Sequence, residues 1–155
     1  VQELTGLRTG DIDLQAATVH VRGTAKTNER TLALEPRQIM LLHRYLKESR
    51  PALLSRNPPP LGELEGAALI ITKNSTPERG EGIHYLVSTF RPLLPTRRLT
   101  PTVIRQSVIA RLLKEGKDLR IVQAFAGHKK PSTTEKYRTT QLEELKAAVD
   151  KYHPK

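Results

Sequence analysis

One short stretch of the sequence brings together groups that can hold and attack a phosphate. Within residues 128–137 it places the imidazole of His128, the ammonium groups of Lys129 and Lys130, and the phenol of Tyr137. Cationic groups bind phosphate oxygens, and a phenol is a nucleophile that can form a covalent intermediate. A simple turn followed by a surface helix would show the same local pattern, so this interpretation depends on partners elsewhere in the chain.

Composition restricts the possible partners. The 155 residues suit one domain, and 26 Lys and Arg residues against 16 Asp and Glu residues give a net charge of +10. This excess favours a polyanionic partner, nucleic acid before an anionic membrane surface, although a basic ribosome-like protein would share it. The absence of Cys excludes disulfides, thiolate nucleophiles and Cys-ligated zinc, and is compatible with the cytoplasm. No apolar run approaches the roughly 20 residues that span a membrane, so we expect no membrane segment.

A predicted hairpin in the first third of the chain could present a lysine side chain to a ligand. Alternating apolar and polar residues on both sides of a polar loop predict strands over 18–22 and 30–34, with Lys26 near the tip of the loop. A Lys there is either a solvated charge or a group presented to a ligand. Asp11 and Asp13 flank one Ile with no third ligand nearby, which favours a turn leading into a strand over a metal site.

Apolar residues at helical spacing dominate the remainder of the chain. The predicted helices are the end of one at 3–7, one from Pro36 to about Glu48, one through Tyr85 and Leu93, one from Pro101 to Gly116, one over 119–125 stopped by Gly127, one over 133–137 and one over 141–152. The Pro-rich residues 51–66 predict a loop, and the apolar run 68–71 predicts a buried third strand.

Several short motifs lie at characteristic distances from one another along the chain. They are residues 3–14, the hairpin with Lys26, residues 100–105, residues 112–116, Ala126-Gly127-His128 and Thr133 to Tyr137. Together they resemble the C-terminal catalytic domain of tyrosine recombinases, the phage integrase family, whose closing signature is an H-x-x-R helix, a Gly-His turn and T-T-x-x-Y. The separations of 23 residues from Arg105 to His128 and nine from His128 to Tyr137 agree with that pattern.

The resemblance implies a fold and a domain organisation. The fold would be α+β and mostly helical, with a small three-stranded antiparallel sheet from 18–22, 30–34 and 68–71. An N-terminally truncated catalytic domain would cover 1–140. Residues 141–155 would form a C-terminal tail helix that contacts either a neighbouring protomer or its own core.

The resemblance also assigns chemical roles. Tyr137 would attack phosphorus and form a 3′-phosphotyrosyl link, Arg105 and His128 would bind the phosphate, and Lys26 would protonate the departing 5′ oxygen. A planar guanidinium suits bidentate phosphate contact, and a flexible ammonium suits proton donation. Thr102 stands where the family has a histidine; its hydroxyl can contact phosphate but cannot shuttle a proton near neutral pH. The family's reaction requires no metal or other cofactor.

Two further sets of residues follow from the same resemblance. Glu3 would be an orienting carboxylate, but the family's first arginine would immediately precede Val1, so within this sequence Glu3 would have no arginine to orient. We expect the parent protein to carry that arginine and an N-terminal DNA-clamping domain. The cations expected to contact DNA phosphates beside the site are Arg97, Arg98, Lys129 and Lys130.

The function that the resemblance implies is site-specific recombination of double-stranded DNA, as in integration or excision of a mobile element. The enzyme would cleave and rejoin strands as a homotetramer on DNA in the bacterial cytoplasm, and the present chain would be weakly active or inactive by itself. Two alternatives stay open. A type IB topoisomerase would relax DNA without a partner protomer, and a degenerate recombinase, which Thr102 favours, would only bind DNA.

Overall fold

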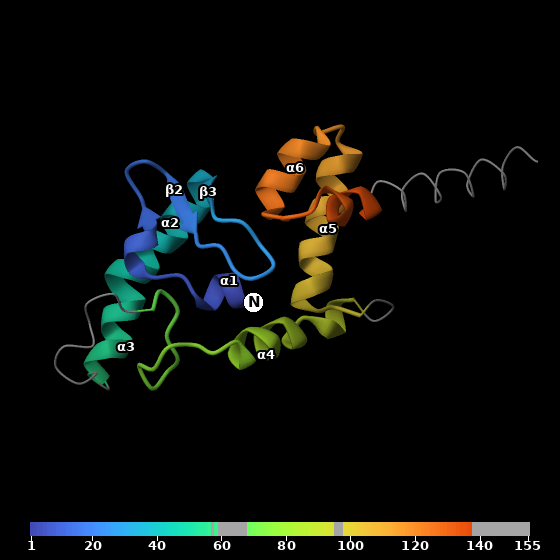
Figure 1. Cartoon of the computed structure of the whole chain (residues 1–155). Coiled ribbons are helices and arrows are strands. Elements are labelled where there is room, and N and C mark those ends of the chain that lie inside the picture. Colours follow the sequence, from blue (N-terminus) through green and yellow to red (C-terminus); the bar gives the residue numbers. More distant parts are fainter. Residues whose placement is uncertain (57, 59–67, 95–97, 138–155) are drawn as a thin grey trace, which may run out of the picture.

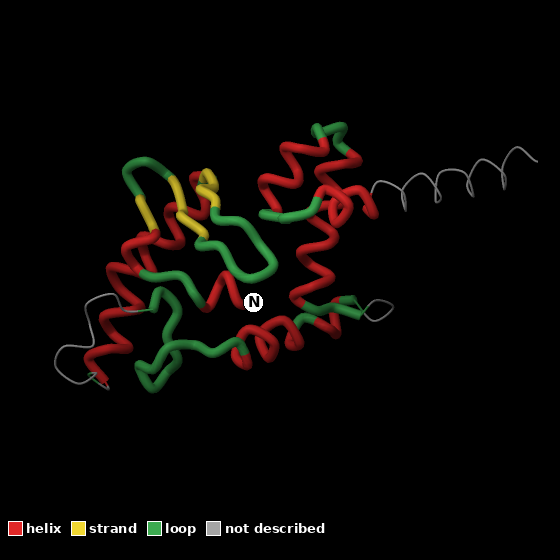
Figure 2. The backbone as a smooth tube through the Cα atoms, viewed as in Figure 1, coloured by secondary structure: helices red, strands yellow, loops and turns green. Residues whose placement is uncertain are grey.

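The computed structural model describes residues 1–56, 58, 68–94 and 98–137. Over these residues the chain is mostly helical with one small sheet (Figure 1, Figure 2), which confirms the predicted fold class. The elements in chain order are α1 (Gln2–Thr5), η1 (Thr9–Asp11), β1 (Ile12–Asp13), β2 (Thr18–Val21), β3 (Arg30–Ala33), α2 (Pro36–Arg44), η2 (Tyr45–Ser49), α3 (Arg50–Arg56), α4 (Glu81–Thr89), η3 (Arg91–Leu93), α5 (Pro101–Lys114) and α6 (Leu119–Ala126). Residues 131–137 are also helical.

The sheet is antiparallel with the strand order β1-β2-β3. Val19 in the central strand pairs with Ile12 on one side and Leu32 on the other. Val19 and Val21 are buried whereas the residues between and before them are only half-buried, which is the alternation that predicted this hairpin. The hairpin prediction is therefore confirmed, and the loop between β2 and β3 carries Lys26.

The third strand of the sheet is β1, and the prediction of a strand over 68–71 is wrong. The run forms two isolated bridges, Arg8 with Ala68 and Ile71 with Pro77. Leu69 is nevertheless buried in the same core as the sheet. A short continuous apolar run indicates burial and does not identify the backbone partner, so it could not distinguish a strand from a buried connection.

The Asp11 and Asp13 prediction of a turn leading into a strand is confirmed.

Residues 51–56 are helical, so the predicted loop over 51–66 is wrong in its first part. Pro51 cannot donate a hydrogen bond, and its ring crowds the preceding turn of an α-helix. A wider π-helical turn, η2, directly precedes it, and the Arg50 N–H bonds to the carbonyl of Tyr45 five residues back. The local widening lets the chain continue into α3 rather than stop near Glu48.

The helices of the last third follow their predicted boundaries. The Thr100 hydroxyl accepts a hydrogen bond from the Val103 N–H at 3.1 Å, which caps the start of α5. Gly116 follows α5 with φ of +77°, and Gly127 ends α6 with φ of +70°. Positive φ values are readily adopted by glycine, which explains why both residues mark helix ends.

The described residues form two hydrophobic clusters rather than one. The first, under the sheet, contains Leu7, Val19, Val21 and Leu69; the second, between α5 and α6, contains Ile109, Val122 and Ala126. In Figure 1, α1, the sheet, α2 and α3 lie on one side and α5 with α6 on the other, while the β2–β3 loop extends towards α6. The candidate site residues Lys26, Arg105 and His128 lie where these two parts meet.

Some predictions fall on residues that the structure does not describe. They are the tail helix over 141–155, Arg97, and residue 57 with residues 59–67 of the Pro-rich segment. Among the helices that are described, none has both the length and the apolar character needed to cross a membrane.

Candidate functional site

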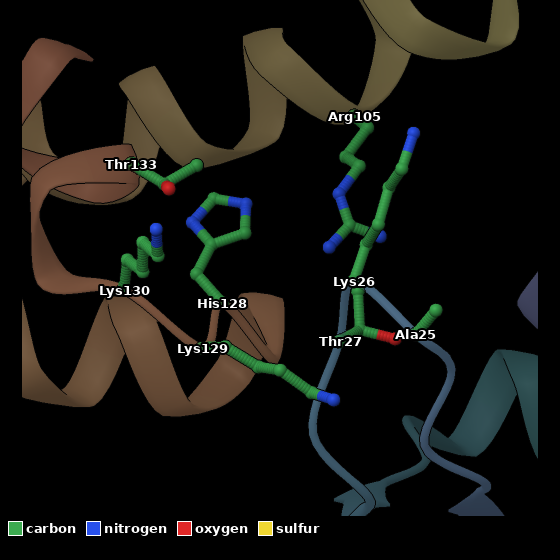
Figure 3. Close-up of a pocket in the computed structure, with 8 residues that line it drawn as sticks. All are labelled: Ala25, Lys26, Thr27, Arg105, His128, Lys129, Lys130 and Thr133. Carbon is green, nitrogen blue, oxygen red and sulfur yellow. The ribbon is translucent and has the colours of Figure 1, made fainter.

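A pocket of about 500 Å³ lies between the hairpin loop and the C-terminal helices. It is lined by Ala25, Lys26, Thr27, Arg105, His128, Lys129, Lys130 and Thr133 (Figure 3). Five of the residues predicted from the sequence therefore meet at one place, although they come from the β2–β3 loop, from α5 and from the turn after α6. The concentration of positive side chains suits an anion such as phosphate.

The position of Arg105 follows from the packing of α5 on α6. Arg105 precedes the fully buried Ile109 by four residues, so both lie on the same face of α5. That face packs against Val122 and Ala126 of α6. One nitrogen of the Arg105 guanidinium donates to the carbonyl of Ala126, at the C-terminal end of α6. This contact anchors the guanidinium while its side chain remains 37% exposed to the pocket.

His128 is held by its backbone and by its ring. The His128 N–H donates to the carbonyl of Gln123 at 3.1 Å, and the Gln123 amide donates to the carbonyl of His128 at 3.0 Å. The ring Nδ1 lies 2.9 Å from the hydroxyl of Thr134, which is completely buried. Because Nδ1 is occupied in this way, Nε2 is the nitrogen that can serve a ligand in the pocket.

The charge state of His128 is also set by its surroundings. Burial lowers the pKa of His128, and the positive charges of Arg105 and Arg30 lower it further, while Glu3 opposes them. The imidazole is therefore biased towards its neutral form. A neutral ring that accepts at Nδ1 from Thr134 carries its proton on Nε2, where it can donate to a phosphate oxygen.

The loop that carries Lys26 is bound to the turn that carries His128. Thr27 and His128 form an antiparallel bridge, and the Asn28 N–H donates to the carbonyl of Gly127 at 2.8 Å. Within the loop the hydroxyl of Thr24 accepts from the Lys26 N–H at 3.2 Å, which shapes the tip. This pairing places the exposed Lys26 at the edge of the pocket.

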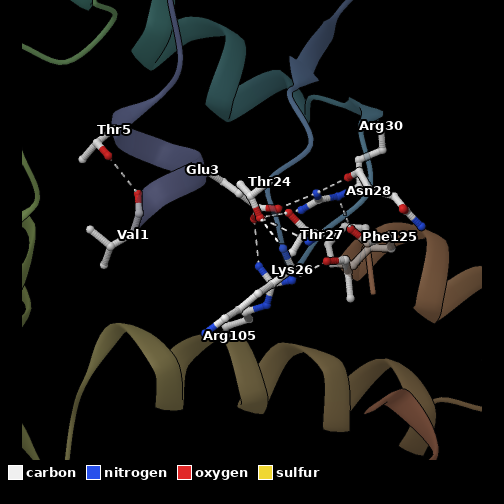
Figure 4. A network of polar contacts seen from close by, with 11 residues as sticks. Val1, Glu3, Thr5, Thr24, Lys26, Thr27, Asn28, Arg30, Arg105 and Phe125 are labelled. Atoms are coloured by element: carbon white, nitrogen blue, oxygen red, sulfur yellow. Dashed lines mark hydrogen bonds and ion pairs between the residues drawn. The ribbon is translucent and has the colours of Figure 1, made fainter. Parts of the chain in front are cut away.

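Glu3 lies at the centre of a network of charges next to the pocket (Figure 4). One carboxylate oxygen is 2.7 Å from Nη1 of Arg30, and the other is 2.8 Å from Nη1 of Arg105 and 3.2 Å from Nη2 of Arg30. The expectation that Glu3 would have no arginine to orient is therefore wrong. The fold supplies two arginines from distant parts of the chain, and one of them is Arg105 itself.

The network changes the acidity of Glu3. Burial raises the pKa of Glu3, but hydrogen bonds from Arg30, Thr27 and Arg105, together with the charge of Arg30, outweigh burial and lower it from 4.5 to about 2. Glu3 is therefore ionised at neutral and mildly acidic pH, and it can hold both guanidiniums in fixed positions.

We expect Glu3 to make the stability of the fold depend on pH. Because its pKa is lower in the folded than in the unfolded chain, its stabilising effect is complete above about pH 4.5 and is lost as the pH falls towards 2. The difference between 4.5 and about 2, at about 1.4 kcal/mol per pH unit, corresponds to about 3 to 4 kcal/mol. Urea unfolding of the wild type and of Glu3→Gln between pH 7 and 2 measures it.

The gap in unfolding free energy between the two proteins should narrow by most of this amount as the pH falls. The matched control is Glu115→Gln, because Glu115 forms an exposed ion pair with Arg111 that contributes little. Parallel curves for the wild type and Glu3→Gln would contradict the assignment of the low pKa to the network.

Tyr137 lies beside His128 rather than on the pocket wall. The two rings are stacked, with centroids 6.4 Å apart and planes at 13°. Tyr137 is half-buried and packs against the cluster of Ile109, Val122 and Ala126. Among the described residues, those that line the pocket do not include Tyr137.

The other predicted residues lie nearer the surface. Thr102 is exposed one turn before Arg105 on α5 and does not line the pocket. Arg98 is exposed in the segment that leads into α5. Within the part of the chain that the structure describes, there is no group of three His, Asp or Glu side chains arranged to hold a metal ion.

Sequence reasoning missed two residues that support the site, Arg30 and Thr134. Arg30 shares the inward face of β3 with Leu32, and a charged residue on a core-facing position signals a buried partner. Thr134 is completely buried and bonds to the His128 ring, but its burial is visible only in the folded chain. The sequence signal at Arg30 indicates a need for a partner without identifying the partner.

Comparison with known proteins gives the same family as the motifs. The profile of the phage integrase family matches residues 1–144. Tyrosine recombinase XerD of Lacticaseibacillus casei is 32% identical over 160 residues, which cover 100% of this chain and 50% of that protein. The chain thus spans about half the length of the relatives it matches.

Solved structures show the same fold. A crystal structure of XerA recombinase superposes with a TM-score of 0.70 and 21% identity, covering 99% of this chain and 53% of that one. XerH site-specific recombinase bound to its palindromic difH substrate gives a TM-score of 0.72 and 20% identity, covering 96% of this chain and 40% of that one. The predicted tyrosine recombinase catalytic-domain fold is therefore confirmed.

Proposed function

We propose, because this chain belongs to the phage integrase family, that it is the catalytic part of a site-specific recombinase that cleaves and rejoins double-stranded DNA. The observation that carries the proposal is the pocket that unites Lys26, Arg105 and His128, with Tyr137 stacked on His128. The relatives named above are tyrosine recombinases, which favours recombination over DNA relaxation and over DNA binding alone.

The proposed reaction uses each group once. Arg105 and the Nε2–H of His128 bind the non-bridging oxygens of a DNA phosphate and stabilise the charge that grows there. The phenol of Tyr137 gives its proton to solvent water, its oxygen bonds to phosphorus, and the bond from phosphorus to the 5′ oxygen breaks. Lys26 donates a proton to that departing oxygen. The 3′-phosphotyrosyl link keeps the bond available for rejoining.

Thr102 sets an upper limit to the rate. The family places a histidine at this position, and a threonine hydroxyl cannot exchange protons near neutral pH. Loss of a general acid or base typically costs about 10² to 10⁴ in rate. Thr102 does not line the pocket, but Lys26, Arg105 and His128 do, so we propose slow cleavage rather than none.

The test of the proposed function is capture of the covalent intermediate. A duplex nicked one nucleotide from the cleavage point loses its short 5′-hydroxyl fragment after attack, so the protein stays attached to DNA. The full-length gene product, incubated with such nicked duplexes from its host element, should give a species that survives denaturing electrophoresis and disappears on protease treatment. If the protein binds DNA but forms no covalent complex with any of the duplexes, it would be a DNA-binding protein without cleavage activity.

Exposed cations beside the pocket are proposed to contact the DNA backbone. Changing Lys129 and Lys130 together to Gln should weaken binding of duplex DNA and make its salt dependence shallower by about 2 in the slope of log affinity against log salt, because each lost phosphate contact removes about 0.9. Fluorescence anisotropy over a range of salt concentrations measures this slope. Arg97 and Arg98 are also proposed to contact DNA phosphates.

The control for this experiment is a double change of equal charge away from the pocket. Lys114 and Lys117, at the far end of α5 and just after it, are exposed and do not line the pocket. Changing both to Gln should leave the slope within experimental error of the wild type. Equal losses from the two double variants would mean that binding depends on net charge rather than on the pocket.

The arrangement of protomers is proposed from the family alone. We propose that the full-length protein acts as a homotetramer on DNA, with the tail over 141–155 as the contact between protomers and 1–140 as the catalytic unit. The protein would act on DNA in the bacterial cytoplasm.

A further inference from the structure

The two hydrophobic clusters of this chain meet across a polar boundary, and the pocket lies on that boundary. The Lys26 loop comes from the side of the sheet, whereas Arg105, His128 and Tyr137 come from the side of α5 and α6. The two sides are joined by the bridge between Thr27 and His128, the hydrogen bond from Asn28 to Gly127 and the ion pair between Glu3 and Arg105. The geometry of the pocket therefore depends on a few directional contacts.

Arg30 makes more of these contacts than its position in a strand would suggest. Its guanidinium pairs with both oxygens of Glu3, and its Nε donates to the carbonyl of Phe125 at 2.7 Å. Nη1 also lies 3.3 Å from the carbonyl of Asn28 in the Lys26 loop. A single side chain thus joins α1, the loop and the C-terminal end of α6.

Arg30 and Arg105 form a symmetrical pair around Glu3. Each guanidinium binds the carboxylate of Glu3 and a carbonyl in the last turn of α6, Phe125 for Arg30 and Ala126 for Arg105. The C-terminal end of a helix carries partial negative charge, which favours both cations. The Arg30 side chain is only 12% exposed and the Arg105 side chain 37%, so Arg105 can face a phosphate while Arg30 is enclosed.

We propose that Arg30 is a positioning residue that fixes the Lys26 loop against the Gly127-His128 turn and so assembles the catalytic pocket. It acts through Glu3, Phe125 and Asn28, and it is not among the residues that line the pocket. Its effect on DNA cleavage rests on the proposed function, whereas its effect on the assembly of the pocket does not.

The contacts require an arginine rather than any cation. A guanidinium presents five N–H groups in a rigid fork, so it can bind a carboxylate on one edge and a carbonyl on another. An ammonium at position 30 could reach Glu3 or the carbonyl of Phe125, but a single nitrogen cannot span both in this geometry. Arg30→Lys should therefore keep the charge and lose part of the assembly.

The first experiment follows the hydrogen bond from the Asn28 N–H to the carbonyl of Gly127, which closes the boundary next to Arg30. Amide hydrogen exchange, read residue by residue by NMR on this chain without DNA, should be at least tenfold faster at Asn28 in Arg30→Met than in the wild type. The amides of β2 and β3 should exchange as before. Arg30→Lys should give an intermediate rate at Asn28.

The matched control is Arg22→Met, because Arg22 lies at the other end of the same loop. It pairs with Asp11 at 2.6 Å and makes no contact with α6 among those of the described residues. Its removal should leave exchange at Asn28 within twofold of the wild type. If Arg30→Met does not fold, the comparison of Arg30→Lys with Arg22→Lys decides the question in the same way.

The second experiment separates assembly from chemistry. In the full-length protein, Arg30→Lys should slow formation of the covalent DNA complex at least tenfold while the dissociation constant for DNA changes less than twofold, because the DNA-contacting cations remain. Unchanged exchange at Asn28 in folded Arg30 variants, or an unchanged cleavage rate, would overturn the proposal. If the wild type does not cleave DNA, the proposed function fails, and exchange at Asn28 still decides the positioning role.

Discussion

A Tyr137→Phe variant of the full-length protein is expected to form no covalent complex with DNA while it binds DNA with unchanged affinity. The substitution removes one hydroxyl and leaves the aromatic ring, so the stacking on His128 and the packing against Ile109, Val122 and Ala126 should persist. Without the phenolic oxygen there is no nucleophile to bond to phosphorus. Denaturing electrophoresis of the nicked-duplex reaction measures the loss, and anisotropy measures the affinity.

The control for Tyr137 is Tyr85→Phe. Tyr85 lies on α4, is 73% exposed, and is another tyrosine whose hydroxyl could be suspected of attack. Its variant should form the covalent complex at the wild-type rate. A covalent complex that persists in Tyr137→Phe would assign the nucleophile to another residue and would overturn the proposed mechanism.

Replacing Arg105 by Ala is expected to slow formation of the covalent complex by about 10² to 10³. The guanidinium is the group best placed to bind the phosphate, since Glu3 and the carbonyl of Ala126 fix it at the pocket. Arg105→Lys should recover only part of the rate, because an ammonium lacks the bidentate fork. Single-turnover measurements on a nicked duplex give these rates.

The fold should survive the loss of Arg105, because Arg30 still pairs with both oxygens of Glu3. The matched control is Arg111→Ala on the same helix, where an exposed ion pair with Glu115 is removed and neither rate nor stability should change measurably. A rate for Arg105→Ala within threefold of the wild type, with normal folding, would exclude Arg105 from phosphate binding.

The elements that could be predicted from the sequence are those with a local cause. The alternation around Lys26 identified the hairpin because a half-buried strand repeats every two residues. The boundaries of α5 and α6 were predictable because Pro101 suits the first turn of a helix, and Gly116 and Gly127 readily adopt the positive φ found at helix ends.

The errors concern causes that are not local. The run 68–71 is apolar because it is buried, but its backbone partners are decided by the placement of β1. Pro51 ended the predicted helix because proline breaks a regular α-helix, and a π-helical turn just before it removed the conflict. Neither outcome could be read from the residues of the segment itself.

The candidate site shows the same division. Motif spacing grouped Arg105 with His128, the hairpin pattern added Lys26, and the structure places all three at one pocket. The partners of Glu3 could not be predicted, because they are 27 and 102 residues away in the sequence. Only the folded chain shows that the carboxylate binds two arginines and that both of them also bind α6.

The close packing around Gly127 restricts which amino acids can replace it. A methyl group added there would meet Nη1 of Arg30 at 2.5 Å and the carbonyl oxygen of Asn28 at 3.1 Å, in a backbone with φ of +70° that side chains rarely adopt. The positive φ and the contact with the Asn28 carbonyl oxygen would remain whatever residue stood at position 30, and a displaced Arg30 guanidinium would lose its contacts with Glu3 and Phe125. Substitutions at Gly127 should therefore be rare among functional sequences, and a smaller residue at position 30 should not restore them.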